Sequence, residues 1–314
     1  MDVVTFGETM VLMIPTKHGP LDTVGEFQKG LAGAESNVAI GLARLGHEVA
    51  WISKLGLDSF GRFIYKTLRG EGVDVSRVRF DEIRPTGVFF KEFMGDGRTH
   101  AYYYRNNSAA SQMSLADIPL VDFAGASYLV VTGITPALSP LNQTTTFQCI
   151  EKAHQYGMQV VFDPNIRRKL WSIEEARPVL NTIASQADIV LPGIEEGTIL
   201  TGHTHAPEIA QAFINHGSQL VVVKLGPEGA YYQSAAGKGY VGGFQVHLVD
   251  EVGAGDAFTA GLLSGLLNGL DLPSAVKRAC ALGALTVTGT GDYEHLPYRH
   301  DLDVFLNGIV DPGR

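Results

Sequence analysis

A short segment rich in small residues carries the side chains that could do chemistry. Gly253, Ala254 and Gly255 precede Asp256, and residues 257–267 repeat apolar side chains at helical spacing. The small residues therefore stand at a helix N-terminus, where free backbone amides and the helix dipole favour an anion. Asp256 lies in the first turn, where a carboxylate can accept a proton from a hydroxyl. The pattern indicates an anion-binding turn beside a base; a plain turn with a helix cap is the alternative.

Composition limits the partners of the chain. Its 314 residues are 45% apolar and 18% charged, which suits one large domain with a substantial core. The formal net charge of -9 argues against nucleic acid or an anionic membrane as a partner. The first 15 residues lack a signal-peptide pattern, and the longest apolar run, at 257–270, is too short and polar for a membrane span. Cys149 and Cys280 lie in apolar helical stretches, which indicates reduced thiols in a cytoplasmic protein.

Strands and helices alternate along most of the chain, which predicts an α/β fold with a doubly wound, mostly parallel sheet in a single domain of residues 1–314. The strands are expected at 3–7, 49–53, 127–132, 159–162, 189–191 and 219–224. The helices are expected at 36–45, 59–68, 139–156, 173–184, 207–216, 257–267 and 273–287. Ligands of such sheets bind beyond the carboxyl ends of the strands. We therefore expect functional residues at 133–135, 163–167, 192–196, 225–229 and 253–256, the last of these after the apolar run 245–249.

A different pattern occupies residues 86–105. Two strands rich in aromatic residues flank a turn at 94–97, which predicts a hairpin. A small antiparallel β element in an alternating chain is typical of a lid, which we place at about 9–31 and 77–106. Side chains alternate along a strand, so Tyr103 and Arg105 share one face. The alternative to a lid is an edge hairpin whose aromatics pack on a partner subunit, and both can hold at once. The exposed strand and its aromatics favour a homo-oligomer formed through the lid.

Two signatures resemble one family. Residues 250–256 resemble the C-terminal signature of the ribokinase-like (PfkB) carbohydrate kinases, and residues 33–39 resemble their N-terminal signature. The resemblance covers residues 2–309. Within the family, the segments 102–111, 133–140 and 163–171 resemble 2-keto-3-deoxygluconate kinases. This implies a ribokinase-like fold, ATP as co-substrate, Mg²⁺, and phosphorylation of the terminal hydroxyl of 2-keto-3-deoxygluconate to 2-keto-3-deoxy-6-phosphogluconate.

The resemblance also implies roles for individual residues. Asp256 would be the base, and the amides of Gly253, Ala254 and Gly255 would bind the transferred phosphoryl group. The substrate would be contacted by Gly33, Asn37, Phe89, Tyr103, Tyr104, Arg105, Arg167, Asp256 and Asp292. ATP would be bound by Asn165, Arg167, Lys224, Leu225, Gly226, Gly229, Cys280 and residues 253–256.

The metal site departs from the family pattern. Glu196 would be its ligand, but Gly193 stands where relatives carry the Asn of an Asn-x-x-Glu motif. Glu251 stands where relatives usually carry Thr, so a monovalent-cation site near this turn stays an open alternative.

The substrate class can be argued from charge as well. A keto-sugar acid carries a carboxylate, and Arg binds a carboxylate through two parallel hydrogen bonds. Arg105 and Arg167 are therefore expected to hold it; a solvated Arg105 and an Arg167–Asp163 structural pair are the alternatives. A fructokinase or ribokinase-like kinase of a neutral sugar, or a non-catalytic sugar or nucleotide sensor, are the competing functions. An NAD-dependent dehydrogenase is disfavoured because the first strand lacks the G-x-G-x-x-G turn.

Overall fold

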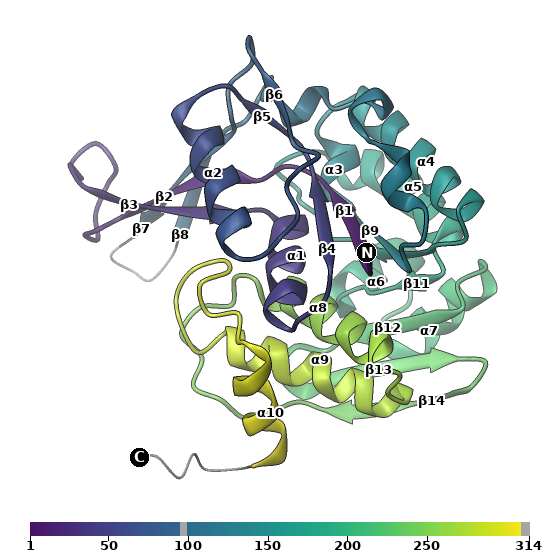
Figure 1. Ribbon diagram of the computed structural model, residues 1–314. Coiled ribbons are helices and arrows are strands. Elements are labelled where there is room, and N and C mark those ends of the chain that lie inside the picture. Colours follow the sequence, from purple (N-terminus) through teal and green to yellow (C-terminus); the bar gives the residue numbers. More distant parts are fainter. Residues whose placement is uncertain (95–98, 309–314) are drawn as a thin grey trace.

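A central sheet of eight strands organises the computed structural model, which describes residues 1–94 and 99–308 (Figure 1). Neighbouring strands from β4 to β12 run parallel, and the last two strands pair antiparallel. In spatial order the strands are β14 (Gly237–Gly242), β13 (Gly229–Ser234), β12 (Leu220–Lys224), β11 (Ile189–Val190), β10 (Gln159–Asp163), β9 (Tyr128–Thr132), β1 (Val3–Phe6) and β4 (Val49–Ile52). The predicted fold class, a doubly wound and mostly parallel sheet, is confirmed.

Helices cover both faces of this sheet because both faces are apolar. In β1, Val3 belongs to the core on one side, and Val4 and Phe6 belong to the core on the other. The first core is covered by α1 (Ala34–Arg44), α2 (Ser59–Gly70), α8 (Ala254–Leu267), α9 (Leu272–Thr286) and α10 (Arg299–Asn307). The second is covered by α4 (Pro140–Gln155), α5 (Ile173–Gln186), α6 (Ile194–Thr201) and α7 (Ala206–Asn215), with the short α3 (Ile134–Ala137) before α4.

A separate sheet of four strands projects from the body (Figure 1). Its order is β3 (Phe27–Ala32), β2 (Met10–Pro15), β7 (Val88–Phe93) and β8 (Thr99–Tyr104). The two outer pairs are antiparallel and the central β2–β7 pair is parallel. The predicted hairpin strands at 86–105 are thus present as β7 and β8. Most of its predicted turn, residues 95–97, lies outside the described residues. A two-stranded pair, β5 (Lys54–Gly56) and β6 (Arg79–Asp81), completes the strands of the described chain.

The glycine turn leads directly into α8. This helix begins at Ala254, three residues before the apolar periodicity predicted. Gly253 is its N-terminal cap and has a positive φ of 80°. A Cβ at Gly261 would come within 2.8 Å of the Ala279 Cα, so glycine there lets α8 and α9 pack closely.

The apolar segment before the glycine turn is not part of any sheet. The apolar run 245–249 forms no strand, and Leu248 and Val249 are exposed. The hairpin β13–β14 occupies that edge of the sheet, so the run has no partner there. The expected cap of α2 is present: Asp58 accepts a hydrogen bond of 2.7 Å from the Gly61 amide. In residues 1–94 and 99–308, no helix combines the length and the apolar character that a membrane crossing needs.

Candidate active site

The two signature segments meet at Asp256. The Asn37 amide, at the start of α1, donates a hydrogen bond of 2.8 Å to Asp256 Oδ2. Asn165, just after β10, places its amide nitrogen 3.5 Å from Asp256 Oδ1. Its φ is +37°, in a left-handed region that Asn adopts more readily than most residues other than glycine. The carboxylate is therefore fixed from two elements far apart in the sequence.

The surroundings of Asp256 change its acidity. Burial raises the pKa of Asp256 to about 7; the Asn37 hydrogen bond opposes this rise, and the Asp163 charge adds to it. Arg167 is exposed, and its charge lowers the pKa of both Asp256 and Asp292. Burial also raises the pKa of Asp292 to about 7, against the opposing charge of Lys91. Asp256 is thus a carboxyl group that can exchange a proton near neutral pH.

The turn before α8 has little spare room. A Cβ at Gly253 would lie 2.3 Å from the carbonyl oxygen of Asp292, so the 292 backbone packs directly on the turn. The Ala254 amide donates a long hydrogen bond of 3.3 Å to the Glu251 carbonyl. Gly255 faces the Lys224 ammonium, whose Nζ would lie 3.6 Å from a Cβ at that position. A lysine charge and a helix N-terminus therefore face the same space.

Lys224, at the end of β12, is held by the residue that ends β10. Its Nζ donates a hydrogen bond of 2.7 Å to Asp163 Oδ2. Burial opposes the charge of Lys224, but the nearby Asp163 and Glu196 carboxylates outweigh it and raise the pKa of the ammonium. The lysine is therefore charged. Asp163 pairs with Lys224, and the Arg167–Asp163 alternative finds no support in the contacts of the described residues.

Glu196 uses both carboxylate oxygens at the start of α6. Oε1 accepts a hydrogen bond of 2.8 Å from the Ile166 amide, and Oε2 accepts one of 2.8 Å from the Gly193 amide. The second bond caps the helix, so Gly193 serves through its backbone where relatives carry Asn. Within the described residues no group of three metal-binding side chains comes together. Asp163 Oδ1, however, is buried without a hydrogen-bond partner, and its carboxyl group feels the Glu196 charge.

The small sheet brings one aromatic pair and one arginine together. Register pairs Phe89 with Tyr103, and their rings stack 5.1 Å apart. Arg105 is buried, and its Nε donates a hydrogen bond of 2.6 Å to Glu8 Oε2, with Nη2 close to the same oxygen. Ser108 donates to the other oxygen of Glu8. Arg105 is therefore neither solvated nor free, because one side of its guanidinium is bound to Glu8.

The other predicted residues occupy several different places. Tyr104 lies on the opposite face of β8 from Tyr103, is 67% exposed and contacts Phe90 edge to face. Gly33 caps α1 beside the Glu8 backbone. The remaining predicted nucleotide residues occupy two places. Leu225, Gly226 and Gly229 form the turn between β12 and β13, and Cys280 lies half-way along α9.

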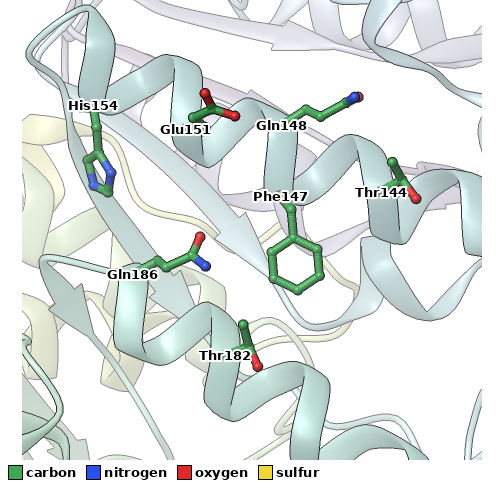
Figure 2. Close-up of a pocket in the computed structure, with 7 residues that line it drawn as sticks. All are labelled: Thr144, Phe147, Gln148, Glu151, His154, Thr182 and Gln186. Atoms are coloured by element: carbon green, nitrogen blue, oxygen red, sulfur yellow. The ribbon is translucent and has the colours of Figure 1, made fainter.

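A surface groove lies elsewhere, between α4 and α5 (Figure 2). Phe147 and the polar side chains around it come from the outer faces of the two helices. Its lining residues are Thr144, Phe147, Gln148, Glu151, His154, Thr182 and Gln186. None of them is a predicted site residue, so the groove and the Asp256 cluster are separate features.

Activity should rise with pH through about 7. A base acts only when deprotonated, and burial sets the pKa of Asp256 at about 7, so kcat/KM falls as the pH drops below that value. In Asn37→Ala the hydrogen bond that lowers this pKa is gone, so the acid limb moves to higher pH. The measurement is kcat/KM against pH for both proteins. An acid limb near the ordinary aspartate pKa, unmoved in the variant, would contradict the assignment.

Sequence reasoning missed two residues of this cluster. Glu8 follows the first strand and binds Arg105, 97 positions later. Lys91, on β7, lies within 3.8 Å of Asp250 and 3.9 Å of Asp292. Lys91 had a signal, because it is a charged residue on the same strand face as the apolar Phe89. Glu8 had none beyond its place directly after a buried strand.

Comparison with known proteins places this geometry in a family. The model for the pfkB family carbohydrate kinase matches residues 1–299. A 2-dehydro-3-deoxygluconokinase of Bacillus subtilis (strain 168) is 45% identical over 311 residues, 98% of this chain and 96% of the relative. The crystal structure of a PfkB protein from Polaromonas sp. JS666 has a TM-score of 0.89 and 44% identity, and covers 96% of this chain and 99% of that one.

A fructokinase is also similar. The enzyme from Vibrio cholerae O395, solved with fructose, ADP and calcium ion, has a TM-score of 0.86 and 32% identity over 98% of this chain and 99% of that one. The sheet, the small sheet beside it and the carboxylate behind the glycine turn define a ribokinase-like α/β protein. The family match across the chain is more specific. The protein belongs to the pfkB family of carbohydrate kinases and is therefore an enzyme that phosphorylates a carbohydrate.

Proposed function

We propose that this kinase uses ATP to phosphorylate the terminal hydroxyl of 2-keto-3-deoxygluconate, also called 2-dehydro-3-deoxygluconate. One observation carries the proposal: Asp256, buried and held by Asn37 at 2.8 Å, stands directly behind the Gly253 turn. A base and an anion-binding helix end are thereby adjacent. The 45% identity to a 2-dehydro-3-deoxygluconokinase over 98% of this chain supports the substrate.

In the proposed reaction, Asp256 accepts the proton of the sugar hydroxyl. The hydroxyl oxygen forms a bond to the γ-phosphorus of ATP while the bond from that phosphorus to the β,γ-bridging oxygen breaks, and ADP leaves with the electron pair. The transition state of such transfers is loose, so positioning and electrostatics dominate. A positioned base contributes about 10²- to 10⁴-fold. The raised pKa of Asp256, about 7, suits a group that accepts a proton late in the reaction.

Backbone amides and Lys224 would together offset the negative charge of the phosphates. The amides of Gly253, Ala254 and Gly255 would face the transferred group, once the long Ala254–Glu251 hydrogen bond of 3.3 Å gives way. Lys224, held by Asp163 opposite Gly255, would add a fixed positive charge. On the nucleotide side we propose contacts from Asn165, Arg167, Lys224, Leu225, Gly226, Gly229 and Cys280.

The described residues fit a divalent metal bound mainly through water. Mg²⁺ keeps several waters and needs only one or two carboxylates besides the phosphates. Glu196 retains one lone pair on each oxygen, and the buried Asp163 Oδ1 has no partner. We propose these two carboxylates for Mg²⁺, which would neutralise phosphate charge when bound. Lys91 already places a positive charge beside Asp250, so a monovalent cation there is the weaker proposal.

The sugar acid would lie under the small sheet. Glu8 fixes the Nε side of Arg105, which leaves the other nitrogen of its guanidinium to meet a carboxylate. Phe89 and Tyr103 would cover the sugar, with Gly33, Asn37 and Asp292 below it. Arg167 would approach either the carboxylate or the phosphates. Tyr104, on the outer face, would act only through the position of its strand.

A neutral sugar is the second candidate, and one contact favours it. Glu8 cancels the charge of Arg105, which weakens its attraction for an acid. The fructokinase likeness supports the same alternative. A non-catalytic sensor is disfavoured by the intact Asp256 cluster.

A substrate panel decides between the acid and the neutral sugar. ADP release is measured for 2-keto-3-deoxygluconate, its galactonate-derived epimer, fructose and ribose. We expect the wild type to prefer a keto acid. In Arg105→Ala, KM for that acid should rise about 10- to 100-fold, because a charge-assisted hydrogen bond to the carboxylate is lost, while KM for neutral sugars changes little. Arg105→Lys is the control for charge alone. An equal loss for acid and neutral sugars would contradict acid recognition by Arg105.

We further propose a cytoplasmic homo-oligomer formed through the small sheet. β8 is an edge strand, and the half-exposed Tyr102 and mostly exposed Tyr104 lie on its outer face. A second copy that covered this face would bury apolar surface at an unpaired strand. Sedimentation that returns the mass of one chain at micromolar concentration would exclude it.

A further inference from the structure

A lysine lies on the inner, apolar face of the small sheet. Met10, Leu12, Ala32 and Phe89 form a buried cluster on this face. Lys91 follows Phe89 by two positions on β7, so both side chains point to the same side. Only 8% of Lys91 is exposed. A buried ammonium is costly unless it is paired, so its partners decide what it does.

The partners of Lys91 are carboxylates on both sides of the glycine turn. Its Nζ lies 3.8 Å from Asp250 Oδ2 and 3.9 Å from Asp292 Oδ1. Asp250 is tied to the turn, because its Oδ1 accepts a hydrogen bond of 3.2 Å from the Val252 amide. Asp292 is tied to it as well, through the carbonyl oxygen that packs on Gly253. One ammonium from the small sheet thus contacts both supports of the turn.

These ion pairs are not at their closest distance. A charge-assisted N–H···O bond measures about 2.7–2.9 Å, so Lys91 could approach each carboxylate by about 1 Å. Asp292 Oδ1 is buried without a hydrogen-bond partner, so it can accept such a bond. A small movement of β7 toward the body would therefore turn two loose ion pairs into hydrogen bonds that hold the turn.

We propose that Lys91 is a positioning residue that couples sugar binding under the small sheet to nucleotide binding at the Gly253 turn. The inference rests on the proposed function. Sugar in contact with Phe89 and Tyr103 draws β7 inward, and Lys91 then fixes Asp250 and Asp292 and neutralises charges that would repel a triphosphate. Coupling is reciprocal, so sugar tightens nucleotide binding by the factor by which nucleotide tightens sugar binding.

The coupling factor is measured directly by calorimetry. A non-hydrolysable ATP analogue with Mg²⁺ is titrated into each protein with and without saturating 2-keto-3-deoxygluconate. In the wild type, sugar should tighten nucleotide binding by about fivefold or more. In Lys91→Met the factor should fall toward one, and Lys91→Arg should keep part of it. Lys29→Met is the matched control: Lys29 is a lysine of the same sheet that packs over Phe63 on the other face, and its variant should keep the wild-type factor.

Other results would overturn the proposal. An unchanged factor in Lys91→Met means that the ion pairs only anchor the sheet, even if the variant unfolds at a lower temperature. A coupling factor of one in the wild type would likewise show that sugar binding and nucleotide binding are not coupled. The substrate assignment fails separately: if ADP release shows a neutral sugar as the substrate, the same titrations with that sugar still test Lys91.

Discussion

Asp256→Asn is expected to lower kcat by about 10²- to 10⁴-fold while the enzyme keeps its fold and its affinity for ATP. The asparagine oxygen can still accept the hydrogen bond that Asn37 makes at 2.8 Å, but the side chain cannot take a proton. Burial raises the pKa of Asp256 to about 7 from an ordinary value of 3.8, so the ionised carboxylate destabilises the folded state above pH 7. A neutral asparagine lacks this cost. At pH 8 the variant should unfold at the wild-type temperature or above it.

The measurements for Asp256→Asn are steady-state ADP release, calorimetric ATP affinity and thermal unfolding at pH 8. Asp271→Asn is the control, because Asp271 caps α9 by accepting a hydrogen bond of 2.9 Å from the Ser274 amide. Asparagine caps a helix as well as aspartate does, so this variant should keep wild-type kcat. If Asp256→Asn keeps most of its kcat, Asp256 is not the base.

The second large effect is expected at the turn. Gly253→Ala should lower kcat by about 10²- to 10³-fold, the typical loss when one donor to a developing charge is removed. The residue has a φ of 80°, which costs a non-glycine residue about 1–2 kcal/mol. The new methyl group would also lie 2.3 Å from the Asp292 carbonyl oxygen, which is backbone and cannot rotate away. The turn must therefore move, and its amides move with it.

Gly269→Ala separates backbone strain from displacement of the turn. Gly269 follows the C-terminus of α8 with a φ of 70°, and a Cβ there meets no heavy atom within 4 Å. We expect a stability loss of about 1–2 kcal/mol and an unchanged kcat for this variant. Gly253→Ala should lose more stability and also activity, by chemical denaturation and ADP release. Equal kcat values for the two alanine variants would show that the turn does not bind the transferred group.

Local patterns predicted much of the fold because the elements concerned are encoded locally. Asp58 indicated the start of its helix, because the capping side chain and the Gly61 amide that it binds lie three residues apart. Short apolar runs predicted the buried strands. An apolar run alone does not make a strand: the run 245–249 has no strand partner, because β13–β14 forms that edge of the sheet, and the sequence alone does not show this.

The site was predictable only in part for the same reason. The helix starts that carry Asn37 and Asp256 follow from their small residues, so both were found. The pairing of Arg105 with Glu8 was not predictable, because alternation gives the face of a strand but not what lies opposite it. Lys91 shows the same limit. The alternation of side chains placed it on the same strand face as Phe89, but its carboxylate partners lie about 160 and 200 positions away in the sequence and could not be predicted.

The bond between Asn37 and Asp256 spans 219 positions, which has a consequence for biosynthesis. The chain leaves the ribosome with its N-terminus first. Asn37, on α1, can therefore bind Asp256 only after α8 has emerged. Until then, the apolar surfaces on which α8 and α9 pack, those of α1, β13 and β14, stay open to water. A nascent chain of this protein is therefore inactive and prone to aggregation for most of its synthesis. Both its activity and its protection from aggregation depend on the C-terminal helices α8 and α9.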